Sequence, residues 1–203
     1  CRFLPTDQDT VFVSPLTAGG TLSGVDTVCY DDNSGRITLG ADAIGDVVKW
    51  EASEDGGTTW TDINNTNSIY DYADLTTTTT YRVLVKSGVC NEEYSTTVQV
   101  VVRPLPVAEI TGVGANSVCE GSTTWITYSV SNVMASQSWT LKYLEGSTTK
   151  TVSGTGSMSD TIWTGSLKST TDVTLQTIVI TSGDPLCANM NLTNNQTTTI
   201  TVI

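Results

Sequence analysis

The sequence contains no histidine, and this absence excludes several classes of chemistry. Without imidazole, the chain has no histidine metal ligand, and no nucleophile can be activated through a histidine triad. No apolar run is long enough to span a membrane, and no basic-then-apolar signal segment opens the chain. We therefore expect a processed or excised piece of a precursor that is not an enzyme and has no direct membrane span.

Charge is also scarce. Only 15% of the 203 residues are charged, and acids outnumber bases by 21 to 9. The net charge of −12 would repel nucleic acid and anionic membrane surfaces alike. Threonine, by contrast, supplies roughly a fifth of the chain. Because threonine, valine and isoleucine are stiff at χ1 and favour strands, this composition indicates an all-β protein without a nucleic acid partner.

The chain repeats itself at an offset of 89 residues. Residues 1–16 match residues 90–105 in a cysteine, a Val-x-Val run and a Pro-Leu pair, all at this one offset. A looser third copy begins at Cys187 and closes the chain. A fixed spacing of this size is typical of tandem arrays. We predict the last strand of a preceding repeat in residues 1–16, followed by two whole repeats in residues 17–103 and 104–203.

Both predicted repeats consist of short alternating segments separated by turn residues. Residues 36–39 and 79–85 alternate in the first repeat, residues 123–130 alternate in the second, and residues 173–180 supply a further strand there. No segment shows the 3.6-residue period of a helix. Seven or so strands at this spacing predict two tandem immunoglobulin-like β-sandwiches, of immunoglobulin, fibronectin III or PKD type.

Four cysteines stand at matching places in the two repeats. Cys29 precedes Cys90 by 61 residues, and Cys119 precedes Cys187 by 68 residues. We interpret them as one disulfide within each repeat, Cys29–Cys90 and Cys119–Cys187. Each bond would stabilise its repeat by roughly 4 kcal/mol on the loop-entropy model. Disulfides also predict a location outside the cytoplasm.

Residues 53–60 fit the Asp-box pattern S-x-D-x-G-x-T-W. In such a hairpin the Asp55 carboxylate accepts hydrogen bonds from turn amides, and Gly57 adopts a positive φ. Trp60 anchors the end of the hairpin. Because the pattern occurs once, it predicts a turn and no active site.

Five segments of the chain are distinctive: residues 34–39, 48–61, 81–90, 118–122 and 138–141, with Val-Lys-Trp-Glu-x-Ser-x-Asp-Gly-Gly-Thr-Thr-Trp-Thr as the longest. Together they resemble repeats of very large Bacteroidetes surface proteins, such as the giant gliding-motility adhesins of flavobacteria. The resemblance implies immunoglobulin-like and PKD-like units, export by the type IX system, a place on the bacterial outer-membrane surface, and a filamentous stalk or adhesin. That family has no catalytic residues to carry over.

Residue types suggest two further kinds of site. Oxygen ligands bind Ca²⁺, and six acids crowd the first repeat: Asp31, Asp32, Asp42, Asp46, Glu54 and Asp55. No loop has EF-hand spacing, so we predict no cofactor and keep calcium as the alternative to a solvated acidic surface. Three Asp-Thr-apolar triplets fit the Bacteroidetes O-glycosylation pattern and make Thr10, Thr27 and Thr161 candidate acceptors.

We accordingly expect the structural and adhesive repeat region of a long secreted surface filament, acting in adhesion or gliding. Its partners would be neighbouring repeats of the same chain, and also surface glycans or other cell-surface proteins. Three alternatives stay open: a lipoprotein anchored through Cys1, a pair of carbohydrate-binding modules, or a filament subunit that donates residues 1–16 as a strand. For the carbohydrate alternative, we expect Trp163 to be exposed and Trp125 and Trp139 to pack in the core.

Overall fold

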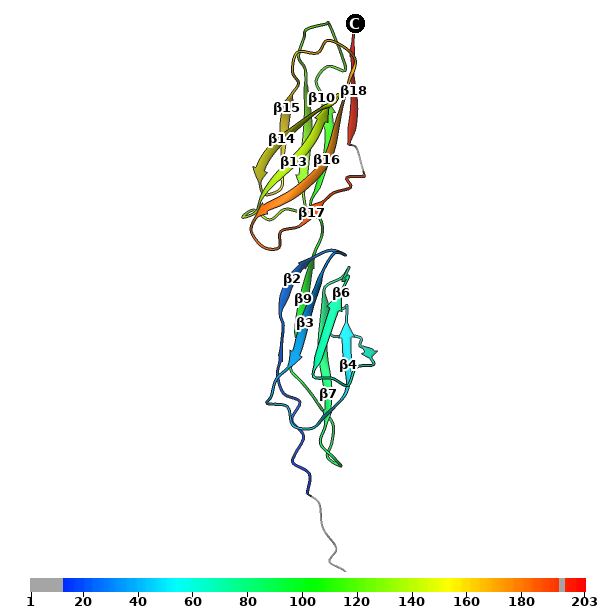
Figure 1. Ribbon diagram of the computed structural model, residues 1–203, viewed down its shortest axis with the longest axis vertical. Coiled ribbons are helices and arrows are strands. Elements are labelled where there is room, and N and C mark those ends of the chain that lie inside the picture. Colours follow the sequence, from blue (N-terminus) through cyan, green and yellow to red (C-terminus); the bar gives the residue numbers. More distant parts are fainter. Residues whose placement is uncertain (1–12, 194–195) are drawn as a thin grey trace, which may run out of the picture. The chain divides into compact units, whose positions relative to one another are not determined.

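The computed structural model describes residues 13–193 and 196–203, and every regular element within them is a β-strand (Figure 1). These residues form two compact units. The first contains the described residues up to Asp26 together with Asp31–Val102, and the second contains Thr27–Tyr30 together with Arg103–Ile203. Most of the strand predicted in residues 1–16 lies outside the described residues, and residues 13–16 form no strand.

The first repeat forms two sheets from short strands. Within residues 13–103 these are β1 (Leu22–Ser23), β2 (Asp26–Cys29), β3 (Ser34–Leu39), β4 (Asp46–Ser53), β5 (Thr61–Ile63), β6 (Ile69–Ala73), β7 (Thr79–Lys86), β8 (Glu93–Tyr94) and β9 (Val98–Arg103). One sheet has the order β1-β3-β6, and the other has the order β2-β9-β7-β4-β5 with β8 paired to β7.

Alternating side chains fill the space between these two sheets. Ile37 of β3, Trp50 of β4 and Val83 of β7 are fully buried. The indole N–H of Trp50 donates to the Asn67 carbonyl at 2.9 Å, so its one polar atom is satisfied inside the core. The Tyr81 ring lies 5.5 Å from the Tyr70 ring, which extends the aromatic packing across the sandwich.

The second repeat is built from β10 to β18. Within residues 104–193 and 196–203 these are β10 (Val107–Val113), β11 (Ser117–Val118), β12 (Trp125–Ser131), β13 (Ser138–Glu145), β14 (Thr148–Thr155), β15 (Met158–Trp163), β16 (Thr171–Ser182), β17 (Ala188–Asn189) and β18 (Thr197–Val202). Its sheets have the orders β10-β12-β15 and β11-β18-β16-β13-β14, with β17 paired to β16.

The two repeats share one strand plan. Each strand of the first repeat has a counterpart in the second whose strand number is higher by nine. The counterpart lies in the corresponding sheet and pairs with the corresponding neighbours. Trp139 follows Trp50 by the 89-residue offset, and both side chains are fully buried. The fold is therefore two tandem immunoglobulin-like β-sandwiches, as the sequence predicted.

The core of the second repeat is more aliphatic than that of the first. Ile126, Leu141 and Ile178 are fully buried, and Trp139 packs edge-on against Tyr128 at 6.3 Å between ring centroids. The indole N–H of Trp139 donates to the Gly156 carbonyl at 2.9 Å. Trp139 thus takes the same role in its sandwich as Trp50 does in the first.

The prediction that Trp125 packs in the core is wrong. In β12, Ile126 and Tyr128 point inward, so the alternation of the strand leaves Trp125 half-buried on the outer face with Thr127. Trp163 is 66% exposed, as expected.

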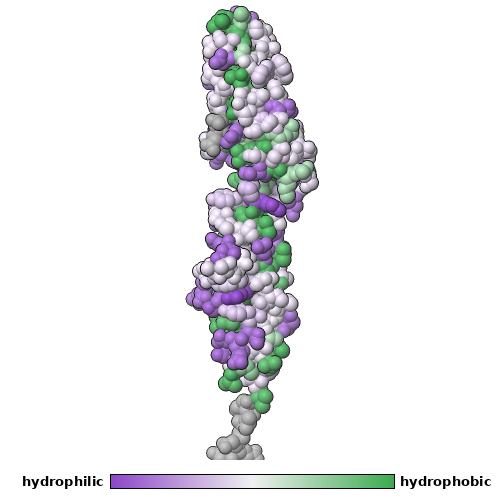
Figure 2. Space-filling view, turned by 180° about the vertical axis from the view of Figure 1, so that it is seen from behind, coloured by the Kyte–Doolittle hydropathy of each residue, from purple (hydrophilic) through white to green (hydrophobic). Residues whose placement is uncertain are grey.

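The surface is mixed in character. On the face drawn in Figure 2, apolar side chains lie in small groups among polar ones rather than in one broad patch. Among the residues that the structure describes, none forms a helix that could cross a membrane.

Candidate functional site

The cysteines are paired differently from the prediction. A disulfide joins Cys29 to Cys187, whose Cα atoms are 5.5 Å apart, and Cys90 and Cys119 are free thiols. The predicted pairings Cys29–Cys90 and Cys119–Cys187 are therefore wrong. The bonded residues are 158 positions apart and come from different sequence repeats.

The physical reason is that the two cysteines of one repeat lie at opposite ends of its sandwich. Cys29 is the last residue of β2 and lies beside Arg103, the last residue of β9. Tyr30, which follows Cys29, donates its N–H to the Arg103 carbonyl at 2.9 Å. Cys90 follows the end of β7, which runs antiparallel to β9. The six residues of β9 cover about 20 Å, whereas bonded cysteines need Cα atoms within about 7 Å.

The Asp-box hairpin has the geometry that its sequence predicted. The Asp55 carboxylate accepts hydrogen bonds from the Thr58 amide at 3.0 Å and from the Thr59 amide at 2.9 Å. Gly57 has φ +96°, and the Trp60 indole donates to the Gly57 carbonyl at 3.0 Å. Hydrogen bonds from the Thr59 hydroxyl and amide and from the Ser53 hydroxyl hold the pKa of Asp55 well below its ordinary value. This carboxylate is thus committed to the turn.

The hairpin delivers Trp60 to a compact charged group on the outer face of the first sandwich. We call it the outer-face cluster, and its members are Lys49, Glu51, Trp60, Asp62, Arg82 and Tyr94. The Arg82 guanidinium lies over both aromatic rings, 3.9 Å from the Trp60 centroid and 3.8 Å from the Tyr94 centroid. Each such contact is a cation–π interaction, so one cation is shared by two aromatic rings.

Glu51 is the buried centre of the outer-face cluster. Its side chain is only 5% exposed, and its carboxylate lies 2.6 Å from Arg82 Nε and 2.7 Å from Lys49 Nζ. Lys49 also contacts Asp62 at 2.6 Å. Burial opposes the charge of Glu51, but the hydrogen bonds from Lys49 and Arg82 prevail and lower the pKa of Glu51 below its ordinary value. The cluster is an ion-pair network whose members neutralise one another.

The six acids proposed as an alternative calcium site come from several separate turns and, for Asp46, from the start of β4. Asp42 accepts from the Thr21 amide and hydroxyl at 3.1 Å each, and Asp55 belongs to the hairpin. Over residues 13–193 and 196–203, no group of three or more His, Cys, Asp or Glu side chains is placed to hold a metal ion.

The candidate glycosylation residues lie in different settings. Thr10 is outside the described residues. Thr27 is half-buried in β2, and Thr161 is exposed in β15. Nothing in the structure tests whether any of them carries sugar, so glycosylation stays a prediction.

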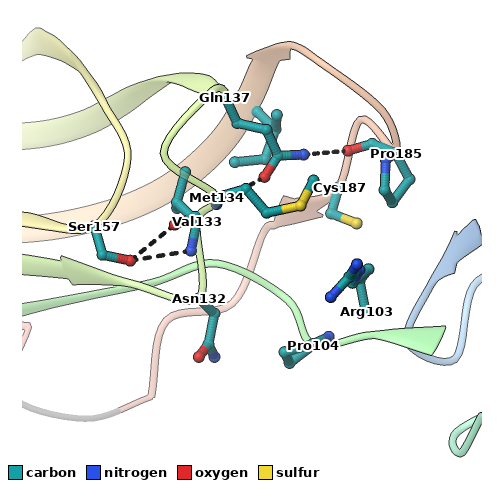
Figure 3. Close-up of a pocket in the computed structure, with 10 residues that line it drawn as sticks. Arg103, Pro104, Asn132, Val133, Met134, Gln137, Ser157, Pro185 and Cys187 are labelled. Carbon is teal, nitrogen blue, oxygen red and sulfur yellow. Dashed lines mark hydrogen bonds between the residues drawn. The ribbon is translucent and has the colours of Figure 1, made fainter. Parts of the chain in front are cut away.

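A cavity of about 230 Å³ lies beside Cys187 in the second unit (Figure 3). Its polar wall is already hydrogen-bonded: the Gln137 amide donates to the Pro185 carbonyl at 3.0 Å, and the Ser157 hydroxyl donates to the Val133 carbonyl at 3.0 Å. Arg103, Pro104 and Cys187 also line the cavity. The walls present no nucleophile paired with a base, so the cavity offers no constellation for covalent or acid–base catalysis.

The signal that sequence reasoning missed is the alternative cysteine register. Cys1, Cys90 and Cys187 form one repeat series, and Cys29 and Cys119 form the other. A cysteine of one series can pair with a cysteine of the other either within one repeat or across the boundary to the next, and both patterns repeat along an array. The outer-face cluster carried no such signal, because its six members come from four strands and the turn.

A family model described as a domain of unknown function (DUF8696) matches residues 18–104. No curated protein matches the sequence.

Three of the similar solved structures share little sequence identity with this chain and cover most of it. A marsupial T cell receptor is 12% identical, with a TM-score of 0.47 over 89% of this chain and 71% of that one. The fibronectin(III)-like modules of Clostridium thermocellum CbhA are 10% identical, with a TM-score of 0.35 over 90% and 93% of the two chains. A Ca²⁺-stabilised adhesin with which an Antarctic bacterium binds ice is 15% identical, with a TM-score of 0.37 over 92% and 50%.

Proposed function

We propose that this chain is a structural and adhesive repeat region of a long, secreted cell-surface protein. One observation carries the proposal: the two sandwiches repeat the same strand plan, sheet by sheet, together with a sequence offset of 89 residues. Tandem units of this kind serve as modular spacers, because each added unit contributes length with its own hydrophobic core.

The composition supports an extracellular setting. The disulfide between Cys29 and Cys187 would be reduced in an ordinary cytosol and persists in oxidising compartments. The net charge of −12 keeps such a chain soluble and disfavours non-specific association with anionic surfaces. In the finer form of the proposal, the parent protein belongs with the giant Bacteroidetes adhesins, is exported by the type IX system, and acts at the outer-membrane surface in adhesion or gliding.

The size of the native polypeptide tests the proposal. Source cells are lysed under thiol-blocking conditions, and the protein is detected by antibody on gels run with and without reductant. We expect a chain many times larger than 21.5 kDa after reduction, with Cys1 recovered as an internal residue. A reduced chain near 21.5 kDa with a lipid mass on Cys1 would instead identify an anchored lipoprotein.

A second candidate function has one observation in its favour. Trp163 is 66% exposed and lies directly opposite Trp125 on the outer face of β12 and β15. Two neighbouring indoles on a sheet surface can stack on sugar rings, which would make the second unit a carbohydrate-binding module. The chain is titrated with bacterial and plant polysaccharides while its tryptophan fluorescence is recorded. We then expect a saturable change in fluorescence that Trp163→Ala abolishes. Unchanged fluorescence across the panel argues against this function.

A further inference from the structure

The four cysteines of the two repeats fall into two structural classes. The first class lies at the end of its own sandwich's last strand. Cys29 ends β2 beside Arg103 of β9, and Cys119 follows β11, whose Val118 carbonyl accepts the Ile203 N–H at 2.9 Å. We call Cys29 and Cys119 the exit cysteines, because each lies where its repeat ends.

The second class lies at the opposite end of the sandwich. Cys90 is located between β7 and β8, and Cys187 is located between the counterparts β16 and β17. Their surroundings also match. The Cys90 thiol donates to the Pro15 carbonyl at 3.4 Å, and Cys187 lines one cavity with Pro104, which follows Pro15 by 89 residues. We call Cys90 and Cys187 the entry cysteines.

The observed disulfide joins the exit cysteine of the first repeat, Cys29, to the entry cysteine of the second, Cys187. The two thiols left over are the entry cysteine of the first repeat, Cys90, and the exit cysteine of the second, Cys119. By the same exit-to-entry pairing, the partner of each would belong to a repeat outside these two. Cys119 is exposed and Cys90 is half-buried, so both are open to reaction.

We propose that Cys90 and Cys119 form disulfides with neighbouring repeats and continue a ladder that has one bond at every repeat junction. Cys90 takes the exit cysteine of a preceding repeat, and Cys119 takes the entry cysteine of a following one. Each bond forms from two thiols with loss of two protons and two electrons, which a disulfide oxidant such as glutathione disulfide accepts. The proposal rests on the tandem-array function above and names the partner of each thiol.

A bond within one repeat does not compete, because about 20 Å of strand separates its entry and exit cysteines. The partners are therefore a neighbouring repeat in the same polypeptide or, for isolated copies of this chain, the complementary cysteine of a second copy. In the latter case Cys119 of one copy must bond Cys90 of the next. The contact is heterologous, so it propagates head to tail instead of closing a symmetric dimer.

This directionality gives a sharp test. The 203-residue chain is prepared with Cys1→Ser, to remove a competing thiol, and with either Cys90→Ser or Cys119→Ser in addition. Each variant is oxidised with glutathione disulfide, alone and as an equimolar mixture, and the products are separated on non-reducing gels. Peptide mass mapping verifies that Cys29–Cys187 is intact and identifies any new bond.

We expect each variant alone to stay monomeric and the mixture to give a dimer linked Cys119–Cys90. The Cys1→Ser chain with both thiols should give a ladder of higher oligomers, lost on reduction. Homodimers of the single variants, formed as readily as the mixed dimer, would show collision of exposed thiols and overturn the proposal. So would monomers in every sample.

Mapping of the native polypeptide separates this inference from the proposed function. A long native chain with Cys90 and Cys119 recovered as free, alkylated thiols would leave the tandem array standing and end the ladder. A short native chain would end both. A long chain in which Cys90 is linked to an exit cysteine of a preceding repeat is the expected result.

Discussion

Replacing Arg82 with methionine should destabilise the first sandwich far more than replacing any exposed cation in it. Methionine keeps most of the aliphatic length of the side chain but removes the guanidinium. The loss leaves Glu51, which is 5% exposed, with Lys49 and the Tyr94 hydroxyl as its remaining partners. It also removes the cation that lies over the Trp60 and Tyr94 rings.

The expected magnitude follows from burial. Removing one partner of a buried ion pair costs about 3–5 kcal/mol, because the other charge is left in a poorly solvated place. Lys49 still neutralises Glu51 at 2.7 Å, so the lower end of this range, about 3 kcal/mol, applies. Arg36→Met is the matched control in the same unit. Arg36 and Asp71 are each 62% exposed, and because water screens such a surface pair, its loss should change stability little.

Hydrogen exchange followed by mass spectrometry measures both variants with an internal reference. Peptides from β4 and β7 report on the first unit, and peptides from β13 and β16 report on the second. A loss of about 3 kcal/mol corresponds to roughly 100-fold faster exchange of the most protected amides. Arg82→Met should show this in β4 and β7 only, and Arg36→Met should change exchange by less than about tenfold. Equal effects of the two substitutions would refute the view that the outer-face cluster stabilises the sandwich.

Three further predictions follow from named contacts. The pKa of Glu51 is lower in the folded state than in the unfolded state. The Glu51 carboxylate therefore contributes its full share to the free energy of unfolding above the unfolded-state pKa of about 4.3, and this share is lost as the pH falls through the folded-state pKa. Glu51→Gln should therefore flatten the decline in stability of the first unit between about pH 5 and pH 3 in urea titrations, and an unchanged slope would contradict this. Asp55→Asn should speed hydrogen exchange in residues 53–60 and leave hydrogen exchange in β7 unchanged, because the Asp55 carboxylate accepts its hydrogen bonds within the turn. Faster exchange throughout the first unit would contradict this prediction. Trp139→Ala should lower the free energy of unfolding, measured by heat or urea, by about 3–5 kcal/mol, because Trp139 is fully buried. The Trp163 side chain is 66% exposed, so Trp163→Ala should lower the free energy of unfolding by about 0.5 kcal/mol or less. Similar losses for the two variants would contradict the burial argument.

The sequence by itself determined the features that depend on near neighbours and on duplication. Alternation of apolar and polar residues identified the strands, because successive side chains of a strand point to opposite faces. The Asp-box pattern gave the correct hairpin, since Asp55, Gly57 and Trp60 interact within six positions of one another. The 89-residue offset predicts a second sandwich independently of the pattern of its strands.

Tertiary structure alone decided which residues meet across the sandwich. Alternation divided β12 into two faces but did not say which face is inward, since aromatic rings occur on both, and sheet packing placed Tyr128 inside and Trp125 outside. Matching positions of the cysteines suggested bonds within each repeat, but β9 holds Cys29 and Cys90 at opposite ends and Cys29 bonds Cys187 instead. Strand register and strand length depend on pairing between distant parts of the chain. Only the folded structure therefore shows that Cys29 and Cys187, which are 158 positions apart, lie within bonding distance.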